Sequence, residues 1–584
     1  MCGIAGFMSR DGSAPDPALL SRLADALAHR GPDGSGLHRQ GDMGMVQTRL
    51  AIIDLETGDQ PLHSDAGIAL VANGEIYNYK DLRNAMPPAR LKTQSDCEPP
   101  LLLYGDQHEA GLDMLRGMFA IALHDSARSR VVLSRDPFGI KPLYIAETPN
   151  GIAFASEPKT LLEAGLASRT LAPEKAMELL QLQFTTGPET PFRDIRRVLP
   201  GETLSIEGGR VVSRRMRPAL PEGPPEAIGE PEALARLDRA LTDSVRVHLQ
   251  SDVGYGMFLS GGIDSSVLLA LIARETGRPV KAYTASFPGS AAHDEGEAAQ
   301  AMAKRFGAEH VQIEFTADDF WSLLPQVAAA LDDPCSDYAA LPTFKLAAVA
   351  AAEQKVVLTG EGGDELFGGY GRYRAAMRPW WRGGRSPRGR GLMDGLRILQ
   401  TEDQSWRDGV HSAEIAASIG GRSRLQVAQA LDCADWLPQD LLTKLDRCLM
   451  AHGLEGRTPF LDPAVAQAAF RLPDRLKVRG RMGKWLLRQY LEELAPGAGA
   501  FERKRGFTVP VAEWIRARGG GLGELVAKQE GVQSLCHAQA IPALFKATDK
   551  RAGQAAWGLL FFALWHQIHI MGGKVGSTSE ETLS

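Results

Sequence analysis

The sequence predicts an α+β domain with large antiparallel sheets, followed by an α/β domain with a doubly wound parallel sheet and a mostly helical C-terminal part. Three observations predict this fold class. Residues 1–215 contain many short apolar strand patterns between turn residues, and few helical patterns. Residues 216–232 are rich in Pro, Gly and Glu without an apolar period, which is typical of a linker. In residues 233–571, strand and helix patterns first alternate and then become mostly helical.

In the first domain, each predicted strand is an apolar run that ends at turn residues. The runs are GMVQTRLAIID at 44–54, IALVANGEIYN at 68–78, MFAIALHD at 118–125, RVVLSRD at 130–136 and GIAFASE at 151–157. Helices are predicted over 17–30 and after SDCE, where Ser95 and Glu98 have the spacing of a capping box. The following Pro99 and Pro100 are expected to strain or delay that second helix.

In the second domain, the alternating patterns predict βαβ units. They are the strand 252–260, the helix 265–277, the strand 280–287, the helix 295–307 and the strand 311–315. Such units build parallel sheets, which bind ligands at the carboxyl ends of their strands. The last residues, 572–584, are polar and are predicted to form a disordered tail.

Bulk composition restricts the class of protein. Hydrophobic residues at 44% and charged residues at 23% are ordinary for a soluble globular chain. A net charge of -6 gives no reason to expect nucleic acid as a partner, and no secretory signal or run of eighteen apolar residues suggests a membrane. The six cysteines are far apart and contain no C-x-x-C pair, which argues against zinc, redox and disulfide frameworks. We therefore expect a cytoplasmic protein.

The N-terminal MCGIAGF places a cysteine directly after the initiator methionine. Removal of the methionine would leave Cys2 with both a thiol and a free α-amine, whose reference pKa is about 8. Such an amine can accept the thiol proton, so the residue would carry its own general base. The alternative is that Cys2 only opens a buried apolar strand.

Two glycine-rich loops follow apolar strands in the second domain. LSGGIDSS, residues 259–266, offers backbone N–H groups and serine hydroxyls to a phosphate, next to the start of a helix. Asp264 would repel a bare phosphate, so we expect Mg²⁺ between them. The loop lacks the G-K-[ST] ending of a Walker A motif, which favours release of pyrophosphate. TGEGGDELFGGY, residues 359–370, adds Glu361, Asp364 and Glu365 after a second strand.

These motifs together resemble a known family. MCGIAGF, HRGPDGSG, RLAIID, NGEIYN and SDCE resemble the class II, N-terminal-nucleophile glutamine amidotransferases, and SGGIDSS resembles the PP-loop of ATP pyrophosphatases. Their order, with TGEGGDELFGGY and GRMGKWLLR, resembles the glutamine-hydrolysing asparagine synthetase family over roughly residues 1–520. For the first domain the resemblance implies an αββα sandwich.

The resemblance implies glutamine hydrolysis in the first domain. Cys2 would attack the side-chain amide of glutamine and form a thioester, and Asn73 and Gly74 would form the oxyanion hole. Arg49 would pair with the substrate α-carboxylate and Asp96 with its α-ammonium group. The complete set of implied glutamine-binding residues is Arg49, Leu50, Asn73, Gly74, Glu75 and Asp96.

In the second domain, the resemblance implies that ATP activates a carboxylate by adenylation. Asp264 and Asp364 would hold Mg²⁺, Glu361 would act on the acyl-adenylate, and Lys484 would stabilise charge at the reacting phosphate. The implied ATP-binding residues are Leu259, Ser260, Gly261, Gly262, Asp264, Ser265, Ser266, Ser286, Thr359 and Gly360.

The implied reaction converts aspartate, ATP and glutamine to asparagine, AMP, pyrophosphate and glutamate, with ammonia passing between the domains. Two alternatives stay open at the level of sequence. One is an amidotransferase of the same architecture that amidates another carboxylate, such as a uronic acid or a peptide side chain. The other is a cyclase related to β-lactam synthetases, against which the presence of Cys2, Arg49, Asn73 and Asp96 argues.

A homodimer is an open expectation. The arginine-rich stretch 378–391 has no counterpart, and we expect a mobile solvated loop there.

Overall fold

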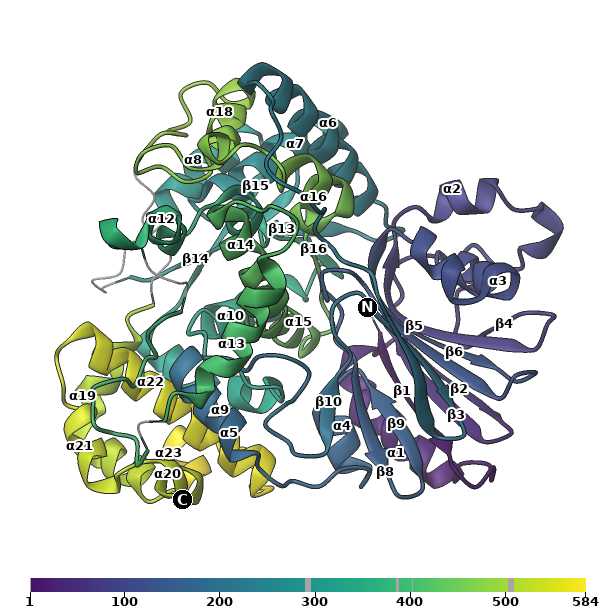
Figure 1. Ribbon diagram of the computed structural model, residues 1–584, viewed down its shortest axis with the longest axis horizontal. Coiled ribbons are helices and arrows are strands. Elements are labelled where there is room, and N and C mark those ends of the chain that lie inside the picture. The colour runs from purple at the N-terminus through teal and green to yellow at the C-terminus, as the bar shows by residue number, and fades with distance from the viewer. Residues whose placement is uncertain (1, 289–295, 385–387, 402, 503–508) are drawn as a thin grey trace.

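The computed structural model describes residues 2–288, 296–384, 388–401, 403–502 and 509–584 of the 584-residue chain. The first part of the chain forms two six-stranded antiparallel sheets, and the second part forms one five-stranded parallel sheet. Figure 1 shows the two sheets layered on one side of the molecule, with the helix-rich second part beside them. The predicted fold class is confirmed.

The first antiparallel sheet has the strand order β10-β8-β9-β1-β3-β2. Its strands are β1 (Gly3–Ser9), β2 (Gly34–Gln40), β3 (Met43–Arg49), β8 (Tyr144–Thr148), β9 (Gly151–Ala155) and β10 (Ile195–Arg197). The second sheet has the order β12-β11-β7-β6-β5-β4. Its strands are β4 (Leu62–His63), β5 (Ile68–Ile76), β6 (Gly117–Asp125), β7 (Arg130–Arg135), β11 (Glu202–Glu207) and β12 (Arg210–Met216). Alternate apolar residues of both sheets, such as Ile4, Met45, Val71 and Leu133, form the core between them.

The helices of the first part of the chain are α1 (Pro17–Leu27), α2 (Tyr79–Asn84), α3 (Glu98–Gln107), α4 (Pro158–Glu163) and α5 (Pro173–Leu182). Helices α1 and α4 pack on the first sheet and α3 on the second, whereas α5 packs against a helix of the second part. Helix α1 begins where the Asp16 side chain accepts a hydrogen bond from the Ala18 N–H, with Pro17 at the first helical position. Its buried leucines recur at spacings of one, three and four residues and face the first sheet.

Helix α3 begins differently from the sequence prediction. It starts at Glu98, which places Pro99 and Pro100 in its first turn, where no intrahelical N–H bond is lost. Glu98 does not form the expected capping box with Ser95. Its carboxylate instead accepts hydrogen bonds from the backbone N–H groups of Lys92 and Thr93, at 2.7 and 3.1 Å. The two prolines therefore do not delay the helix, contrary to the sequence prediction.

The parallel sheet has the strand order β15-β14-β13-β16-β17. Its strands are β13 (Tyr255–Phe258), β14 (Lys281–Ser286), β15 (Glu309–Glu314), β16 (Val356–Leu358) and β17 (Glu455–Arg457). The chain starts at the central strand β13, winds outward to β15 and returns to β16 on the other side of β13. The crevice at the carboxyl ends of β13 and β16 is therefore the topological switch point, where sheets of this type bind ligands. Sequence reasoning missed β17, a three-residue strand with two charged residues.

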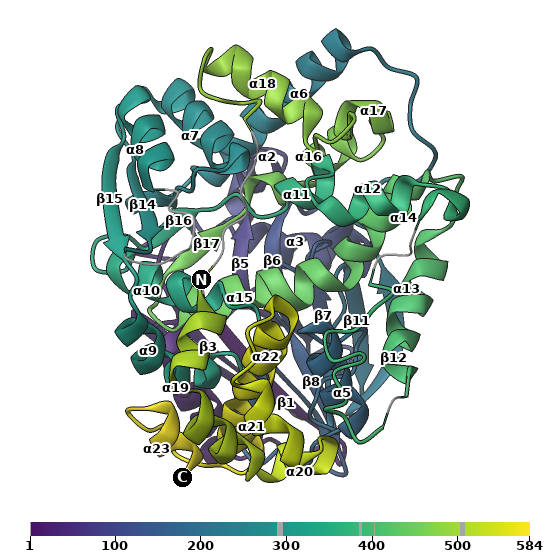
Figure 2. The same ribbon diagram turned by 90° about the vertical axis from the view of Figure 1, so that its left-hand side faces the viewer.

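Helices surround the parallel sheet and make up most of the chain beyond it (Figure 2). They are α6 (Glu230–His248), α7 (Ile263–Thr276), α8 (Gly296–Arg305), α9 (Ala317–Ala330), α10 (Ala340–Ala350), α11 (Gly363–Phe367), α12 (Gly371–Met377), α13 (Asp408–Ala417), α14 (Arg424–Leu431), α15 (Thr443–Met450), α16 (Pro463–Ala469), α17 (Asp474–Lys477), α18 (Trp485–Leu494), α19 (Val511–Ala527), α20 (Glu530–Leu535), α21 (Ile541–Leu544), α22 (Lys550–Trp565) and α23 (Ser579–Leu583). A π-helix, Asp432–Leu442, joins α14 to α15.

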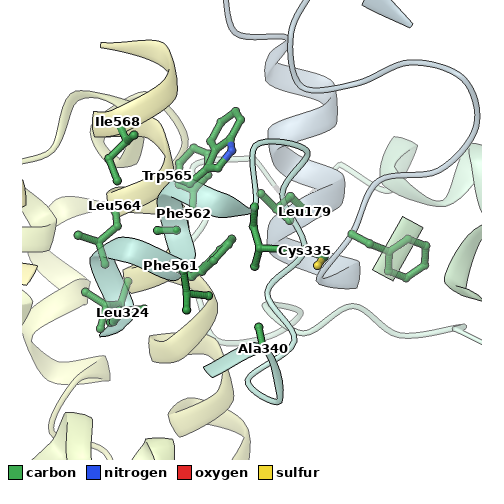
Figure 3. Close-up of a cluster of buried hydrophobic side chains, with 14 of the residues drawn as sticks. Leu179, Leu324, Cys335, Ala340, Phe561, Phe562, Leu564, Trp565 and Ile568 are labelled. Carbon is green, nitrogen blue, oxygen red and sulfur yellow. The ribbon is translucent and has the colours of Figure 1, made fainter. Parts of the chain in front are cut away.

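Helix α22 is buried between the two parts of the molecule. Figure 3 shows its Phe561, Phe562 and Trp565 side chains among residues of α5, α9 and the segment around Cys335. Since α5 belongs to the first part of the chain and α9 to the second, this apolar cluster joins them. Such a helix, apolar on all sides, is typical of a protein core.

The C-terminal residues differ from the sequence prediction of a disordered tail. Residues 579–583 form helix α23, which Thr578 caps by accepting a hydrogen bond from the Glu581 N–H. Leu583 is buried, and its carbonyl accepts a hydrogen bond of 2.9 Å from Gln529 Nε2. Buried Leu583, the Thr578 cap and an ion pair of 2.7 Å between Arg518 and Glu580 dock this polar segment, and composition alone does not predict such contacts.

In the stretch 378–391, residues 385–387 lie outside the described residues, and residues 378, 381–383, 389 and 390 are exposed, as expected of a solvated loop. Arg388 differs from this expectation. Arg388 is packed over the rings of Phe184 and Trp436, and its Nη2 lies 3.3 Å from Asp432 Oδ1. This arginine is therefore part of the packed structure.

Candidate active sites

The first candidate site lies at the start of β1, where the two antiparallel sheets meet. The Cys2 N–H donates a hydrogen bond of 3.1 Å to the side-chain oxygen of Asn73, which is on β5 of the other sheet. Cys2 is 8% exposed. Burial raises the pKa of its thiol, whereas the Leu50 N–H and the charge of Arg49 lower it. A thiol in this environment needs a nearby base to become a thiolate.

Asn73 and Gly74 offer donors beside Cys2. Asn73 is fully buried, and its Nδ2 has no hydrogen-bond partner among the described residues. An unpaired buried donor is costly, so a bound acceptor is expected there. Gly74 has φ +149°, and a Cβ at this position would lie 2.0 Å from the Met118 carbonyl oxygen. Only glycine fits this backbone, which explains the N-G pair in the motif.

Charged residues of both signs surround this site. Arg49 ends β3, and its guanidinium donates to Asp59 Oδ1 at 2.6 Å. The Asp96 carboxylate accepts a hydrogen bond of 2.7 Å from the Ile76 N–H, and burial raises its pKa to about 6. Burial and nearby carboxylates raise the pKa of Glu75, whose Oε2 lies 3.5 Å from Nη2 of Arg457. Arg49, Leu50, Glu75 and Asp96 all lie at this end of the sandwich.

Sequence reasoning missed two arginines at this site. Arg30 donates through Nε to the Cys2 carbonyl at 3.2 Å. Arg457, from β17 of the second domain, is fully buried beside Glu75 and forms an ion pair of 2.6 Å with Glu455. HRGPDG was a signal for Arg30. No local pattern indicates that Arg457 lies at this site, because Glu75 is far from it in the sequence.

The second candidate site occupies the switch point of the parallel sheet. A cavity of about 1640 Å³ opens there between the loop after β13 and the loop after β16. The predicted residues that line it are Leu259, Ser260, Gly262, Asp264, Ser265, Thr359, Gly360, Glu361, Asp364 and Lys484. Gly261, Ser266 and Ser286 are not among its lining residues. Ser266 Oγ donates to the Gly262 carbonyl at 2.8 Å, and the Ser286 side chain is buried.

The serines of the first loop define its shape. Ser260 Oγ lies 3.0 Å from Ser265 Oγ and accepts a hydrogen bond from the Gly262 N–H at 3.1 Å. Helix α7 begins directly after Gly262, so its N-terminus points into the cavity region. This loop and helix end have the arrangement that binds phosphate groups.

Lys484 lies between the two predicted metal-binding aspartates. Its Nζ forms ion pairs with Asp264 and, at 2.7 Å, with Asp364 Oδ1. Glycines make room for this cluster: a Cβ at Gly363 would lie 2.5 Å from Asp264 Oδ1, and one at Gly369 would lie 1.7 Å from Asp364 Oδ1. Burial lowers the pKa of Lys484, but the two carboxylates raise it overall, so the lysine is charged.

The donor set at this position fits a magnesium ion that is shared with a phosphate. Among the described residues no group of three His, Cys, Asp or Glu side chains has the geometry of a metal site. Two carboxylates on adjacent loops suffice when phosphate oxygens and water supply the other ligands. Lys484 forms ion pairs with the same two carboxylates, Asp264 and Asp364.

Glu361 lies on the inner wall of the cavity. Burial raises the pKa of its carboxyl group, and the nearby charge of Lys444 lowers it less. Lys444, on α15, lies 3.8 Å from Glu361 Oε1 and 2.8 Å from Asp337 Oδ2. Sequence reasoning missed Lys444, since a lysine in a helix is usually a solvated surface residue.

Comparison with known proteins assigns the family. A family model described as glutamine amidotransferase domain matches residues 1–216, and one described as asparagine synthase matches residues 236–567, more than half of the chain. The chain belongs to the asparagine synthase family. The resemblance inferred from the motifs is thus confirmed.

Relatives of this family match nearly the whole chain. A Mycobacterium bovis protein is 33% identical over 99% of both chains. A Bacillus subtilis protein named asparagine synthetase (glutamine-hydrolyzing) 1 is 30% identical over 98% of this chain and 97% of its own. Asparagine synthetase B (glutamine-hydrolyzing) of Escherichia coli is 29% identical over 92% of this chain and 86% of its own. None of the helices in the described ranges is long and apolar enough to cross a membrane.

Proposed function

We propose that this member of the asparagine synthase family is a glutamine-hydrolysing asparagine synthetase. It converts aspartate, ATP and glutamine to asparagine, AMP, pyrophosphate and glutamate. One observation carries the proposal: relatives of that name match nearly the whole chain, and the chain contains two sites that fit the reaction. A buried cysteine lies beside Asn73, whose Nδ2 lacks a partner among the described residues, and a loop suited to phosphate lines a large cavity.

Glutamine hydrolysis takes place at Cys2. After removal of Met1, the free α-amine accepts the thiol proton and Sγ attacks the amide carbon of glutamine. Asn73 Nδ2 and the Gly74 N–H stabilise the oxyanion, and the protonated amine delivers the proton with which ammonia leaves. Water then cleaves the thioester and releases glutamate. The buried Asn73 donor, which lacks a partner among the described residues, supports this assignment.

Glutamine is held by its α-substituents. Arg49 receives the α-carboxylate and Asp96 the α-ammonium group. Arg49 donates through Nη2 to the carbonyls of Ile53 and Asp54 and through Nη1 to the Asp59 carboxylate. The Asp59 side chain is 83% exposed, so a substrate carboxylate can replace it at little cost. A buried charged Asp96 is stabilised when an ammonium group binds beside it.

Adenylation takes place in the cavity at the switch point. The aspartate β-carboxylate attacks the α-phosphorus of ATP, and pyrophosphate leaves along the loop of Ser260 and Gly262. Asp264 and Asp364 hold Mg²⁺, which supplies charge neutralisation at the phosphates. Lys484 is placed to stabilise the same charge, and Glu361 to accept a proton from ammonia as it attacks the β-aspartyl-AMP.

Ammonia crosses an interface that excludes water. Tyr77, Met118 and Ile140 of the first domain share one apolar core with Met257 and Leu358 of the parallel sheet. An apolar path keeps ammonia unprotonated and protects the adenylate from hydrolysis.

The six cysteines are all free thiols, which supports a reducing compartment such as the cytoplasm.

One experiment tests both the two-site mechanism and the acceptor. The full-length protein is incubated with ATP, Mg²⁺, glutamine and a panel of carboxylates that includes aspartate and a uronic acid, and AMP and amide products are measured. We expect amidation of aspartate alone. Cys2→Ala should abolish glutamine-dependent synthesis and leave ammonia-dependent synthesis intact. Loss of both activities in the folded variant, or amidation of another carboxylate only, would contradict the proposal.

A further inference from the structure

A buried charge network connects the backbone of Cys2 to helix α15 of the second domain. The Arg30 guanidinium donates through Nε to the Cys2 carbonyl, and through Nη1 and Nη2 to both oxygens of Asp446, at 2.8 and 3.0 Å. Arg30 and Asp446 are separated by 416 residues in sequence. One planar side chain therefore holds the proposed nucleophile and a carboxylate of the other domain at once.

The network leaves Arg30 little freedom. Glu157 Oε1 accepts a further hydrogen bond of 2.6 Å from Arg30 Nη1, and Asp446 also pairs with Arg447 at 2.8 Å. Arg447 in turn pairs with Asp332 at 2.6 Å. These five side chains are at most 3% exposed. Burial lowers the pKa of Arg30, but Asp446 and Glu157 raise it overall, so it keeps its charge.

Cys2 needs such support because of its place in the chain. It lies at the start of the chain, before β1, and is not held by strand pairing of its own. Its N–H is bound by Asn73 and its carbonyl by Arg30. The Asn73 contact comes from the first domain, whereas Arg30 is oriented both by Glu157 of the first domain and by Asp446 of the second.

Helix α15 also contacts the other site. Lys444, two residues before Asp446, lines the synthetase cavity and pairs there with Asp337. The same helix thus places one charged residue at each site.

We propose that Asp446 is a positioning residue for glutamine hydrolysis, by which the synthetase domain orients Cys2 through Arg30. This inference rests on the proposed role of Cys2. Displacement of a reacting atom by about 1 Å can cost on the order of 100-fold in rate. Asp446 touches none of the residues assigned to glutamine, so its loss should change kcat and not KM.

The test compares Asp446→Asn with Asp333→Asn in the full-length protein. Asp333 is a matched control: it is equally buried and binds Arg197 of the first domain through both oxygens, at 2.5 and 2.7 Å, without contact to Cys2. We expect Asp446→Asn to lower the kcat of glutamine hydrolysis at least about 10-fold and to slow alkylation of Cys2 by iodoacetamide. KM for glutamine and ammonia-dependent synthesis should stay within about 2-fold. Asp333→Asn should hydrolyse glutamine normally.

Equal glutaminase kcat and Cys2 alkylation in the two folded variants would overturn the proposal. If Asp446→Asn does not fold, Asp446→Glu is the test variant, since it keeps the charge and shifts the carboxylate by one methylene. A lower glutaminase kcat in that variant supports the proposal, and a normal kcat overturns it. Cys2→Ala distinguishes a failure of the proposed function from a failure of the role of Asp446. Glutamine hydrolysis that survives this change refutes the role of Cys2 itself, independently of Asp446.

Discussion

At the scale of single residues, Asn73 offers the sharpest test of the glutaminase site. Its Nδ2 is a buried donor that lacks a partner among the described residues, and its Oδ1 accepts from Cys2. Asn73→Ala should lower the kcat of glutamine hydrolysis by about 100- to 1000-fold, as expected for loss of an oxyanion-hole donor. Ammonia-dependent synthesis should persist. The exposed Asn84→Ala is the control, and equal glutaminase rates in the two variants would exclude Asn73 from the oxyanion hole.

Asp96 predicts a pH dependence. Burial raises the pKa of this carboxyl group to about 6, so below pH 6 it is protonated in the free enzyme and cannot pair with an α-ammonium group. The α-amine of Cys2, with a reference pKa of about 8, is already protonated below about pH 8 and then cannot accept the thiol proton. The logarithm of kcat/KM for glutamine should therefore fall with decreasing pH and steepen toward a slope of two below pH 6. A slope that stays at one down to pH 5 would contradict the role of Asp96.

The site residues that could be predicted from the sequence are those that belong to a short recognisable motif. Cys2, Asn73 and Gly74 could be identified because the motifs that contain them, MCGIAGF and NGEIYN, resemble those of the glutamine amidotransferases. Arg30, Lys444 and Asp446 are different, because an ordinary charged residue gains its role only from a partner on another element. Burial and pairing across the fold decide these cases, and neither is encoded in local sequence.

At the scale of elements, the loop after β16 depends on its glycines. A Cβ at Gly369 would lie 1.7 Å from Asp364 Oδ1 and 2.3 Å from the Lys484 side chain, so Gly369→Ala must displace the cluster. We expect ATP-dependent AMP formation to fall at least about 10-fold while glutamine hydrolysis persists. At Gly371, two residues later, the nearest atom is 3.4 Å away on the flexible Arg374 side chain, so Gly371→Ala is the control. Similar AMP formation in both variants would show that the cluster tolerates displacement.

Helices and strands with a clear periodic pattern of apolar residues could be predicted from the sequence, and those that depend on single contacts could not. Helix α1 and the strands β5 and β6 follow their apolar patterns. The start of α3 instead depends on how Glu98 binds backbone N–H groups before the helix. Strand β17 is short and charged, and becomes a strand because β16 offers it an edge inside the protein.

At the scale of the whole molecule, the fold keeps two chemistries apart on one shared core. The proposed glutamine site lies where two antiparallel sheets meet, and the proposed ATP site at the switch point of a parallel sheet, with apolar residues of both domains between them. Loss of activity at one site should therefore leave the other site active, except where a contact such as that of Asp446 crosses the interface.

Asp364 tests this independence from the synthetase side. Its carboxylate and that of Asp264 share Lys484 and are the proposed Mg²⁺ ligands beside the phosphates. Asp364→Asn removes one charge from the cluster, which weakens the magnesium site and frees Lys484 to move. AMP formation should fall by on the order of 100-fold, because the cation stabilises charge on the transferring group.

Glutamine hydrolysis by Asp364→Asn should remain near that of the unaltered protein, because Asp364 lines the synthetase cavity and pairs there with Lys484. Asp408→Asn, at an exposed position on α13, controls for the substitution itself. Raising the Mg²⁺ concentration should partly restore AMP formation if Asp364 is a metal ligand. Normal AMP formation in folded Asp364→Asn would show that the carboxylate serves only to hold Lys484. Loss of both activities would show that the two sites are coupled more widely than through Asp446.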